Sequence, residues 1–156
     1  YNDYKTGNNK MKPKIAIVVS TYYKEISGGL LYGVNKVFND HGLSDQLTTN
    51  QLHVPGAFEL PVVIARNIDS FDAFIALGCI IKGKTPHFEL LSNVVTNAIM
   101  DLSIQNKKPI GNGIITCLNK KQALERAHTY KTNKGKEAAI AVLSVLKILK
   151  ENYAPS

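Results

Sequence analysis

Short apolar runs alternate along the chain with segments in which apolar residues recur at helical spacing. The strongest runs are rich in β-branched residues, which is typical of strands buried on both faces of a sheet. The predicted strands are Lys14 to Ser20, Phe71 to Leu77 and Pro109 to Thr116, with a weaker one from Leu47 to Val54. We expect four strands, with the first of them at the centre of the sheet.

Five other segments carry apolar residues three or four positions apart, and this spacing predicts a helix over each of them. The predicted helices run from about Ile26 to His41, from Ala57 to about Asn67, from about Phe88 to Leu102, from Lys121 to about His128, and from Asn133 to about Lys150. Gly42 is suited to cap the end of the first helix, and Pro61 fits the first turn of the second.

Strands that alternate with helices in this way predict an α/β fold with right-handed crossovers between parallel strands. We expect a three-layer α/β/α sandwich with a four-stranded, mainly parallel central sheet. Residues 1–13 are rich in Asn, Lys and Gly without periodicity, so we expect a flexible N-terminal arm there. Residues 14–156 are expected to form a single domain, because 156 residues is an ordinary length for one.

Composition argues against several classes of protein. No apolar run approaches the ~18 residues that span a membrane, and Tyr1 to Lys14 is too polar for a secretory signal. We therefore expect a cytoplasmic protein with no membrane partner. Cys79 and Cys117 are the only cysteines, and no His or Cys residues have the spacing of zinc ligands. We expect neither a disulfide nor a metal site, and both cysteines are predicted to be core residues.

The formal net charge of +7 invites comparison with nucleic-acid-binding proteins. The basic residues are spread along the chain, however, and no basic run is interleaved with aromatic residues. A solvated basic surface explains the charge better, so no nucleic-acid partner is expected. The same charge can attract small anionic substrates.

The stretch from Gly78 to Phe88 is interpreted as the loop between the third strand and the third helix. Such loops lie at the carboxyl ends of strands, where open α/β sheets hold their ligands. The stretch carries a threonine, two lysines and a histidine beside the start of a helix, and the first strand delivers Tyr22 and Tyr23 to the same edge. It is the best candidate for a functional site in the chain.

Residues 78–85 also satisfy G-x-x-x-x-G-K-[ST], the phosphate loop of nucleotide triphosphatases. Taken alone, this match predicts an ATPase or a kinase. A phosphate cradle needs backbone N–H groups turned inward, but the β-branched pair Ile80 and Ile81 resists that geometry and Pro86 has no N–H. No apolar run ends in an aspartate that would hold magnesium. A P-loop nucleotide enzyme is therefore only an alternative.

Three ordered segments resemble one enzyme family. They are Val54 to Pro61 (VPGAFELP), Ala76 to Phe88 (ALGCIIKGKTPHF), and Gln122 to Ala127 (QALERA) with Asn133 to Gly135 (NKG). Together they resemble the 6,7-dimethyl-8-ribityllumazine synthase family of riboflavin biosynthesis, over about Lys14 to Leu149. The resemblance implies a transferase that condenses 5-amino-6-(D-ribitylamino)uracil with 3,4-dihydroxy-2-butanone 4-phosphate, releasing phosphate and water, without metal or cofactor.

The resemblance also implies roles for individual residues. His87 stands at the family's catalytic position, and histidine, with an unperturbed pKa of ~6.5, suits the proton transfers of imine formation. Lys84, Thr85 and Arg126 match the family's phosphate contacts, with Lys134 as a candidate support. The residues that match the segments around the ribityl pyrimidine are Tyr22, Ala57, Phe58, Glu59, Cys79, Ile80, Ile81 and Asn112.

The chain departs from the family's pattern at several positions. Tyr22 replaces a usual phenylalanine and preserves stacking, while Asn112 replaces a frequent phenylalanine that helps to cover the ring. Lys82 replaces a usual arginine, and His128 and Thr132 stand where many members carry glycines. The change at Asn112 leaves open an alternative function, that of a catalytically weak flavin-binding or shell-forming homologue.

The partners implied by the resemblance are small-molecule substrates, further copies of the chain, and riboflavin synthase as a candidate. In the family the active sites lie between subunits, and the equivalents of Asn112 and Arg126 reach the site of the neighbouring chain. The family's ring is a pentamer, which assembles into a sixty-subunit shell in some members. Because His128 and Thr132 lack the easy access of glycine to positive φ, we favour a free pentamer over the shell.

Overall fold

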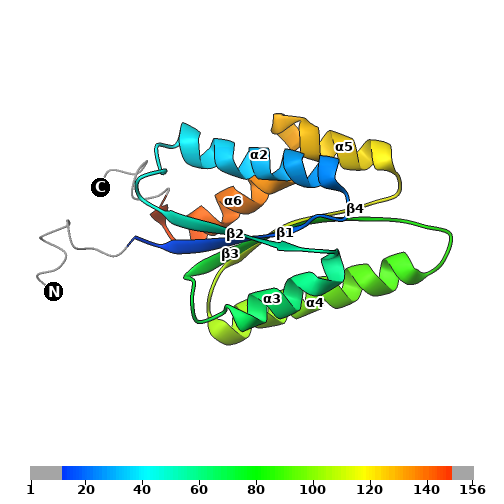
Figure 1. Ribbon diagram of the computed structural model, residues 1–156, viewed down its shortest axis with the longest axis horizontal. Helices are drawn as coiled ribbons and strands as arrows, with labels where there is room; N and C mark the ends of the chain where they lie inside the picture. Colours follow the sequence, from blue (N-terminus) through cyan, green and yellow to red (C-terminus); the bar gives the residue numbers. More distant parts are fainter. Residues whose placement is uncertain (1–11, 149–156) are drawn as a thin grey trace, which may run out of the picture.

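In this computed structural model, which describes residues 12–148, the chain folds around one four-stranded sheet (Figure 1). The strands are β1 (Lys14–Ser20), β2 (Thr48–Val54), β3 (Ala73–Ile81) and β4 (Ile110–Cys117). All four are parallel and lie in the order β2-β1-β3-β4, so β1 is an interior strand, as predicted. Residues 1–11 of the expected arm lie outside the described part.

Helices cover both faces of the sheet. Figure 1 shows α2, α5 and α6 on one face, and α3 and α4 on the other. Their bounds are α2 Lys24–Asp40, α3 Leu60–Arg66, α4 His87–Asn106, α5 Lys120–His128 and α6 Lys134–Val145, with single 3-10 turns η1 at Ala57–Glu59 and η2 at Tyr130–Thr132. The three-layer α/β/α sandwich expected from the sequence is confirmed. Within residues 12–148, no helix is both long enough and apolar enough to cross a membrane.

The sheet buries apolar side chains on both faces, which explains why its interior strands are continuous apolar runs. Ile15, Ile17 and Val19 of β1 belong to the core beneath α2, α5 and α6. Ala16 and Val18 belong to the core beneath α3 and α4. All five side chains are at most 1% exposed. Alternate residues of one strand therefore hold opposite helix layers together.

Strand β3 is longer than predicted, and this corrects the position of the loop that follows it. The strand ends at Ile81 rather than Leu77, because residues 79–81 stay paired with residues 115–117 of β4. Cysteine and isoleucine side chains suit a largely buried, extended strand. The loop before α4 is therefore only residues 82–86.

The last helix is shorter than predicted. Helix α6 ends at Val145, and Lys147 adopts a left-handed φ of 65°. This turn brings Ile148 into the core at 7% exposure, and burial of its side chain stabilises the change of direction. The predicted end near Lys150 lies outside the described residues.

The helix-end signals in the sequence are confirmed. Gly42 follows α2 with a φ of 63°, a left-handed conformation that glycine adopts without strain, and Pro61 lies in the first turn of α3. Both cysteines are buried, as predicted. The sequence also holds two helix caps that were not predicted: the side chains of Asn119 and Asn133 accept hydrogen bonds from backbone N–H groups at the starts of α5 and α6.

Asn133 connects three helices. Its side chain is buried, and Nδ2 donates to the carbonyl oxygens of Gly29 in α2 (3.0 Å) and Ala127 in α5 (2.6 Å). Its Oδ1 accepts from the Lys136 N–H of α6 at 3.0 Å. The amide fits because Gly33 has no side chain, since a Cβ there would overlap Asn133 Oδ1. The glycine in α2 and the asparagine before α6 therefore form one packing unit.

We predict that Gly33→Ala destabilises the fold, whereas Gly28→Ala, on the same helix, does not. The first change forces Asn133 from its hydrogen bonds and should lower the free energy of unfolding by about 2 kcal/mol or more. The second adds a methyl group in open space, and should raise stability by up to ~1 kcal/mol because alanine favours the helix. Urea unfolding of both variants checks this, and equal stabilities would contradict it.

Candidate functional site

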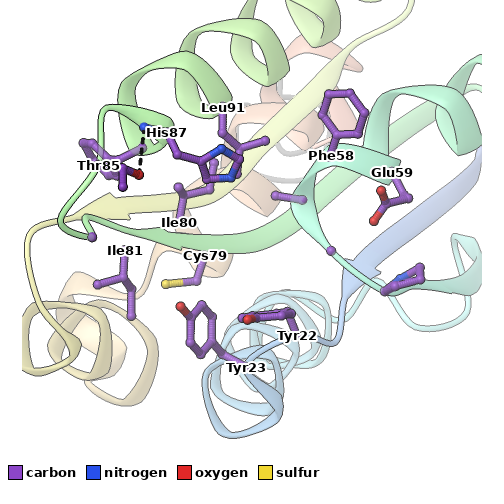
Figure 2. A pocket seen from close by; sticks show the side chains of 15 residues that line it. Tyr22, Tyr23, Phe58, Glu59, Cys79, Ile80, Ile81, Thr85, His87 and Leu91 are labelled. Carbon is purple, nitrogen blue, oxygen red and sulfur yellow. Dashed lines mark hydrogen bonds between the residues drawn. The ribbon is translucent and has the colours of Figure 1, made fainter.

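A cavity of about 680 Å³ opens at the carboxyl edge of the sheet (Figure 2). The segments that follow β1, β2 and β3 line it. Its lining residues are Tyr22, Tyr23, Pro55, Gly56, Ala57, Phe58, Glu59, Cys79, Ile80, Ile81, Gly83, Thr85, His87, Phe88 and Leu91. The place agrees with the rule that parallel sheets hold ligands at the carboxyl ends of their strands.

The segment between β1 and α2 contributes two tyrosines. The rings of Tyr22 and Tyr23 meet edge to face, with centroids 4.8 Å apart and an interplanar angle of 85°. Tyr22 is 72% exposed, so most of its ring is free to contact a ligand. An exposed aromatic ring that a neighbouring ring holds in place is a suitable platform for a flat heterocycle.

The turn between β2 and α3 forms another wall. Phe58 is 63% exposed, whereas Ala57 and Leu60 on either side of it are buried and anchor the turn. The close approach of this turn to β3 depends on Gly78, where a Cβ would lie 3.3 Å from Leu60 Cδ1. Glu59 is half-buried, and within residues 12–148 its carboxylate has no hydrogen bond or salt bridge. The carboxylate is therefore available to accept hydrogen bonds from a ligand.

The end of β3 forms the floor. Pairing of β3 with β1 stops at Leu77, whereas pairing with β4 continues to Ile81. Backbone groups of residues 79–81 that face the β1 side are consequently without a strand partner. Such groups offer donors and acceptors to the edge of a heterocycle that lies on the platform of Tyr22.

The floor is uncharged near neutral pH. Burial, and secondarily the neighbouring Cys117 thiol, raises the pKa of Cys79 to about 12. Burial also raises the pKa of Tyr23, and the adjacent Cys79 adds to this shift. The thiol and the phenol both remain protonated, so the floor suits an uncharged group better than an anion.

His87 is the first residue of α4 and lies opposite Phe58 and Glu59 across the pocket (Figure 2). Its backbone N–H donates to Thr85 Oγ1 at 3.4 Å. The imidazole is exposed and makes no hydrogen bond within the described part of the chain. It is free to exchange protons with a bound ligand, and the start of α4 beside it favours negative charge.

The structure brings most of the predicted site residues together, but four of them do not line the cavity. Lys84 lies in the loop between Gly83 and Thr85, which do line it, and its own side chain is exposed. Lys134 Nζ lies 3.8 Å from Glu137 Oε1, in a salt bridge on α6.

The other two lie on the side of the edge strand β4. Asn112 is exposed, and its Oδ1 accepts from the Ile114 N–H at 3.0 Å. Arg126 Nη1 donates to the carbonyl oxygen of Thr116 at 3.1 Å, and within residues 12–148 its remaining guanidinium donors have no partner. Neither side chain reaches the cavity of its own chain.

Several lining residues were not among the predicted ones. Phe88 lies in the first turn of α4 and Leu91 lies one turn after His87, and their apolar spacing was used only to predict the helix. Placing His87 at the helix start, and asking which residues lie beside it or one turn further on, would have found both. Gly56 and Gly83 gave no signal, because a glycine carries no chemistry of its own.

The nucleotide alternative does not fit the structure. Residues 78–81 of the apparent phosphate loop are extended strand and pair with β4, so they cannot turn their N–H groups around a phosphate. Within residues 12–148, no three His, Cys, Asp or Glu side chains gather in a group that could hold a metal ion.

Comparison with known proteins agrees with this geometry. The family model of 6,7-dimethyl-8-ribityllumazine synthase matches residues 12–150. The protein of that name from Arthrobacter sp. (strain FB24) is 41% identical to the chain, over 88% of the chain and 85% of its own length. The one from Buchnera aphidicola subsp. Baizongia pistaciae is 40% identical, over 92% of the chain and 92% of its own length. The one from Bartonella tribocorum is 40% identical, covering 90% of the chain and 93% of itself. The chain therefore belongs to the 6,7-dimethyl-8-ribityllumazine synthase family.

Proposed function

We propose that the chain condenses 5-amino-6-(D-ribitylamino)uracil with 3,4-dihydroxy-2-butanone 4-phosphate to form 6,7-dimethyl-8-ribityllumazine, in riboflavin biosynthesis. The observation that carries the assignment of the site is the convergence of Tyr22, Glu59 and His87 on one cavity in a chain of this family. The residues come from the ends of three strands, β1, β2 and β3, that are neighbours in the sheet.

The ribityl pyrimidine binds on the inner side of the cavity. Its ring stacks on Tyr22, and its polar edge pairs with the open backbone of Cys79, Ile80 and Ile81. The ribityl chain lies along Ala57 and Phe58, and its hydroxyl groups donate to the Glu59 carboxylate. The neutral floor supports this orientation, because the ring itself needs no counter-ion.

His87 moves protons during the condensation. The amine attacks the ketone, and a proton must pass to the departing hydroxyl before the imine forms. A proton must then leave carbon as phosphate departs, and the second amine closes the ring with loss of a second water. An imidazole in contact with the cavity can serve each transfer near neutral pH.

Phosphate binds at the rim, near the start of α4. Lys84 and Thr85 lie in the loop before this helix, whose N-terminal N–H groups favour an anion. Arg126 provides a bidentate fork that compensates the developing charge when phosphate leaves, with Lys134 as support.

Arg126 and Asn112 act on the cavity of a neighbouring copy. Both are exposed on the β4 side and neither lines the cavity of its own chain, which supports a site completed between subunits. Such a contact joins two different surfaces of the chain, so it repeats from one copy to the next until the ring closes. We propose that this ring is a pentamer, as in the family. The backbone from His128 to Thr132 adopts no positive φ, so the tight bend that glycines would allow there is absent, which supports the free pentamer. Hydrogen bonds from Thr132 Oγ1 to the Glu125 carbonyl oxygen, and between His128 Nε2 and the Glu25 carbonyl oxygen, hold this segment in place.

We predict that His87→Ala lowers turnover by ~100-fold or more while the fold stays intact. The reason is that an exposed imidazole contributes proton transfer and little burial. Lumazine formation followed by absorbance, after subtraction of the uncatalysed rate, measures the effect. His53→Ala, which removes an exposed histidine from β2, is the matched control and should turn over like the wild type. Wild-type turnover in His87→Ala would refute the role.

Arg126→Ala should raise the Michaelis constant for the butanone phosphate ~10-fold or more and leave that for the ribityl pyrimidine nearly unchanged, because only the former carries phosphate. Initial rates with each substrate varied in turn measure both constants. Lys121→Ala removes a positive charge from the same helix and controls for net charge. An equal rise in both constants would mean that Arg126 has a structural role.

A shared site makes a further prediction that uses both variants. When His87→Ala and Arg126→Ala chains are co-expressed, random assembly leaves about one quarter of the sites with both wild-type residues. Assayed at limiting butanone phosphate, where the raised Michaelis constant slows Arg126→Ala, activity should therefore rise about 3-fold above that of Arg126→Ala alone and further above that of His87→Ala. Light scattering of the same sample should give a mass near five chains. Absence of complementation, or a fully active monomer, would contradict the shared site.

A further inference from the structure

Gly56 is a glycine that the backbone does not require. Its φ of −143° and ψ of 174° are extended values that any residue adopts. It lies in the wall of the cavity, between Pro55 and the buried Ala57. A glycine at this position is therefore explained by the space beside its Cα and not by its backbone conformation.

The space beside Gly56 is limited by a single group. A Cβ built there would lie 3.1 Å from Glu59 Oε1, and would meet no other atom within 4 Å apart from its chain neighbours. Ordinary contacts of a Cβ with another heavy atom lie at about 3.5 Å or more, so the carboxylate would have to move by a few tenths of an ångström. Glu59 Oε1 therefore lies closer to this empty position than a side chain at Gly56 would allow.

No hydrogen bond within residues 12–148 fixes the Glu59 carboxylate in any other way. The two residues are joined through the backbone, where the Glu59 N–H donates to the Gly56 carbonyl oxygen at 3.2 Å. This bond holds the two residues in one turn, with Glu59 Oε1 beside the position that a Gly56 side chain would take. A methyl group at Gly56 would therefore push the carboxylate away from its present position.

We propose that Gly56 is a positioning residue for the ribityl chain: the absence of its side chain sets where the Glu59 carboxylate meets the hydroxyl groups. The inference rests on the proposed function and deepens it at the same site. Hydrogen bonds to a carboxylate are strong and directional, and a functional group must lie within ~0.5 Å of its productive position. A displacement of a few tenths of an ångström uses up most of this tolerance and lengthens the hydrogen bonds, so it weakens binding without removing any group that bonds the substrate.

The first experiment uses Gly56→Ala in the full-length assembly. The Michaelis constant for the ribityl pyrimidine should rise about 5-fold, while that for the butanone phosphate and the maximal rate stay within about 2-fold of the wild type. Gly28→Ala, an exposed glycine of α2 with open space around it, is the matched control and should change neither constant. Equal changes in both Michaelis constants would overturn the proposal, since a general disturbance of the turn would affect both substrates.

The second experiment repeats Gly56→Ala in a Glu59→Ala background. With the carboxylate gone, the added methyl group meets nothing, so the further change should be less than about 2-fold. A change as large as in the wild-type background would overturn the proposal, because the methyl group would then obstruct the substrate itself. If the wild-type chain forms no lumazine, the proposed function is overturned. If the enzyme is active but the effects of Gly56→Ala and Glu59→Ala on the Michaelis constant are additive, only the role of Gly56 is overturned.

Discussion

The overhang of β3 beyond β1 is the constraint on which the site depends. Strand β3 continues to Ile81 on the β4 side after its pairing with β1 has ended at Leu77. One row of the backbone groups of β3 pairs with β4, and the other row is left open. The turn between β2 and α3 packs against β3 at Gly78. The segments that carry Tyr22 and Glu59 border the open row, so the extra length of β3 forms the floor of the cavity between these walls.

The helices α2, α5 and α6 on one face of the sheet hold Arg126 in position, and their packing depends on small residues. Asn133 bonds the carbonyl oxygens of Gly29 and Ala127, and it can do so only because α2 presents glycines at the crossing. Arg126 is the residue before Ala127, and its guanidinium bonds the end of β4. The motif QALERA thus depends on NKG for its position, although the two motifs lie on different helices. This is a physical reason for both segments to occur in one chain.

Periodicity predicted the strands, the helices and the layer order, because apolar burial on both faces of a parallel sheet leaves a strong pattern. It failed at Cys79 to Ile81, where the motif suggested a loop but cross-strand pairing with β4 extends the strand. The three-helix contact of Asn133 could not be predicted, since it joins residues about a hundred positions apart. The resemblance placed Tyr22, Glu59 and His87 among the candidate site residues, and the structure adds that all three line one cavity. Gly56 could not be found from the motif, because its contribution is the space beside one carboxylate oxygen.

Charge is distributed in a way that orients two different substrates. Burial holds the Cys79 thiol and the Tyr23 phenol in their neutral forms, so the floor offers no counter-ion to a phosphate. Lys84 and the N–H groups at the start of α4 lie at the rim, where an anion is stabilised. On the proposed function, this arrangement favours the uncharged ring inside and the phosphate outside, so the bond between the two substrates forms in the space between them. His87 lines the cavity from the first turn of α4, and its imidazole has no hydrogen bond within the described chain, so the proposed electrostatics and the proposed proton transfer agree on one part of the cavity.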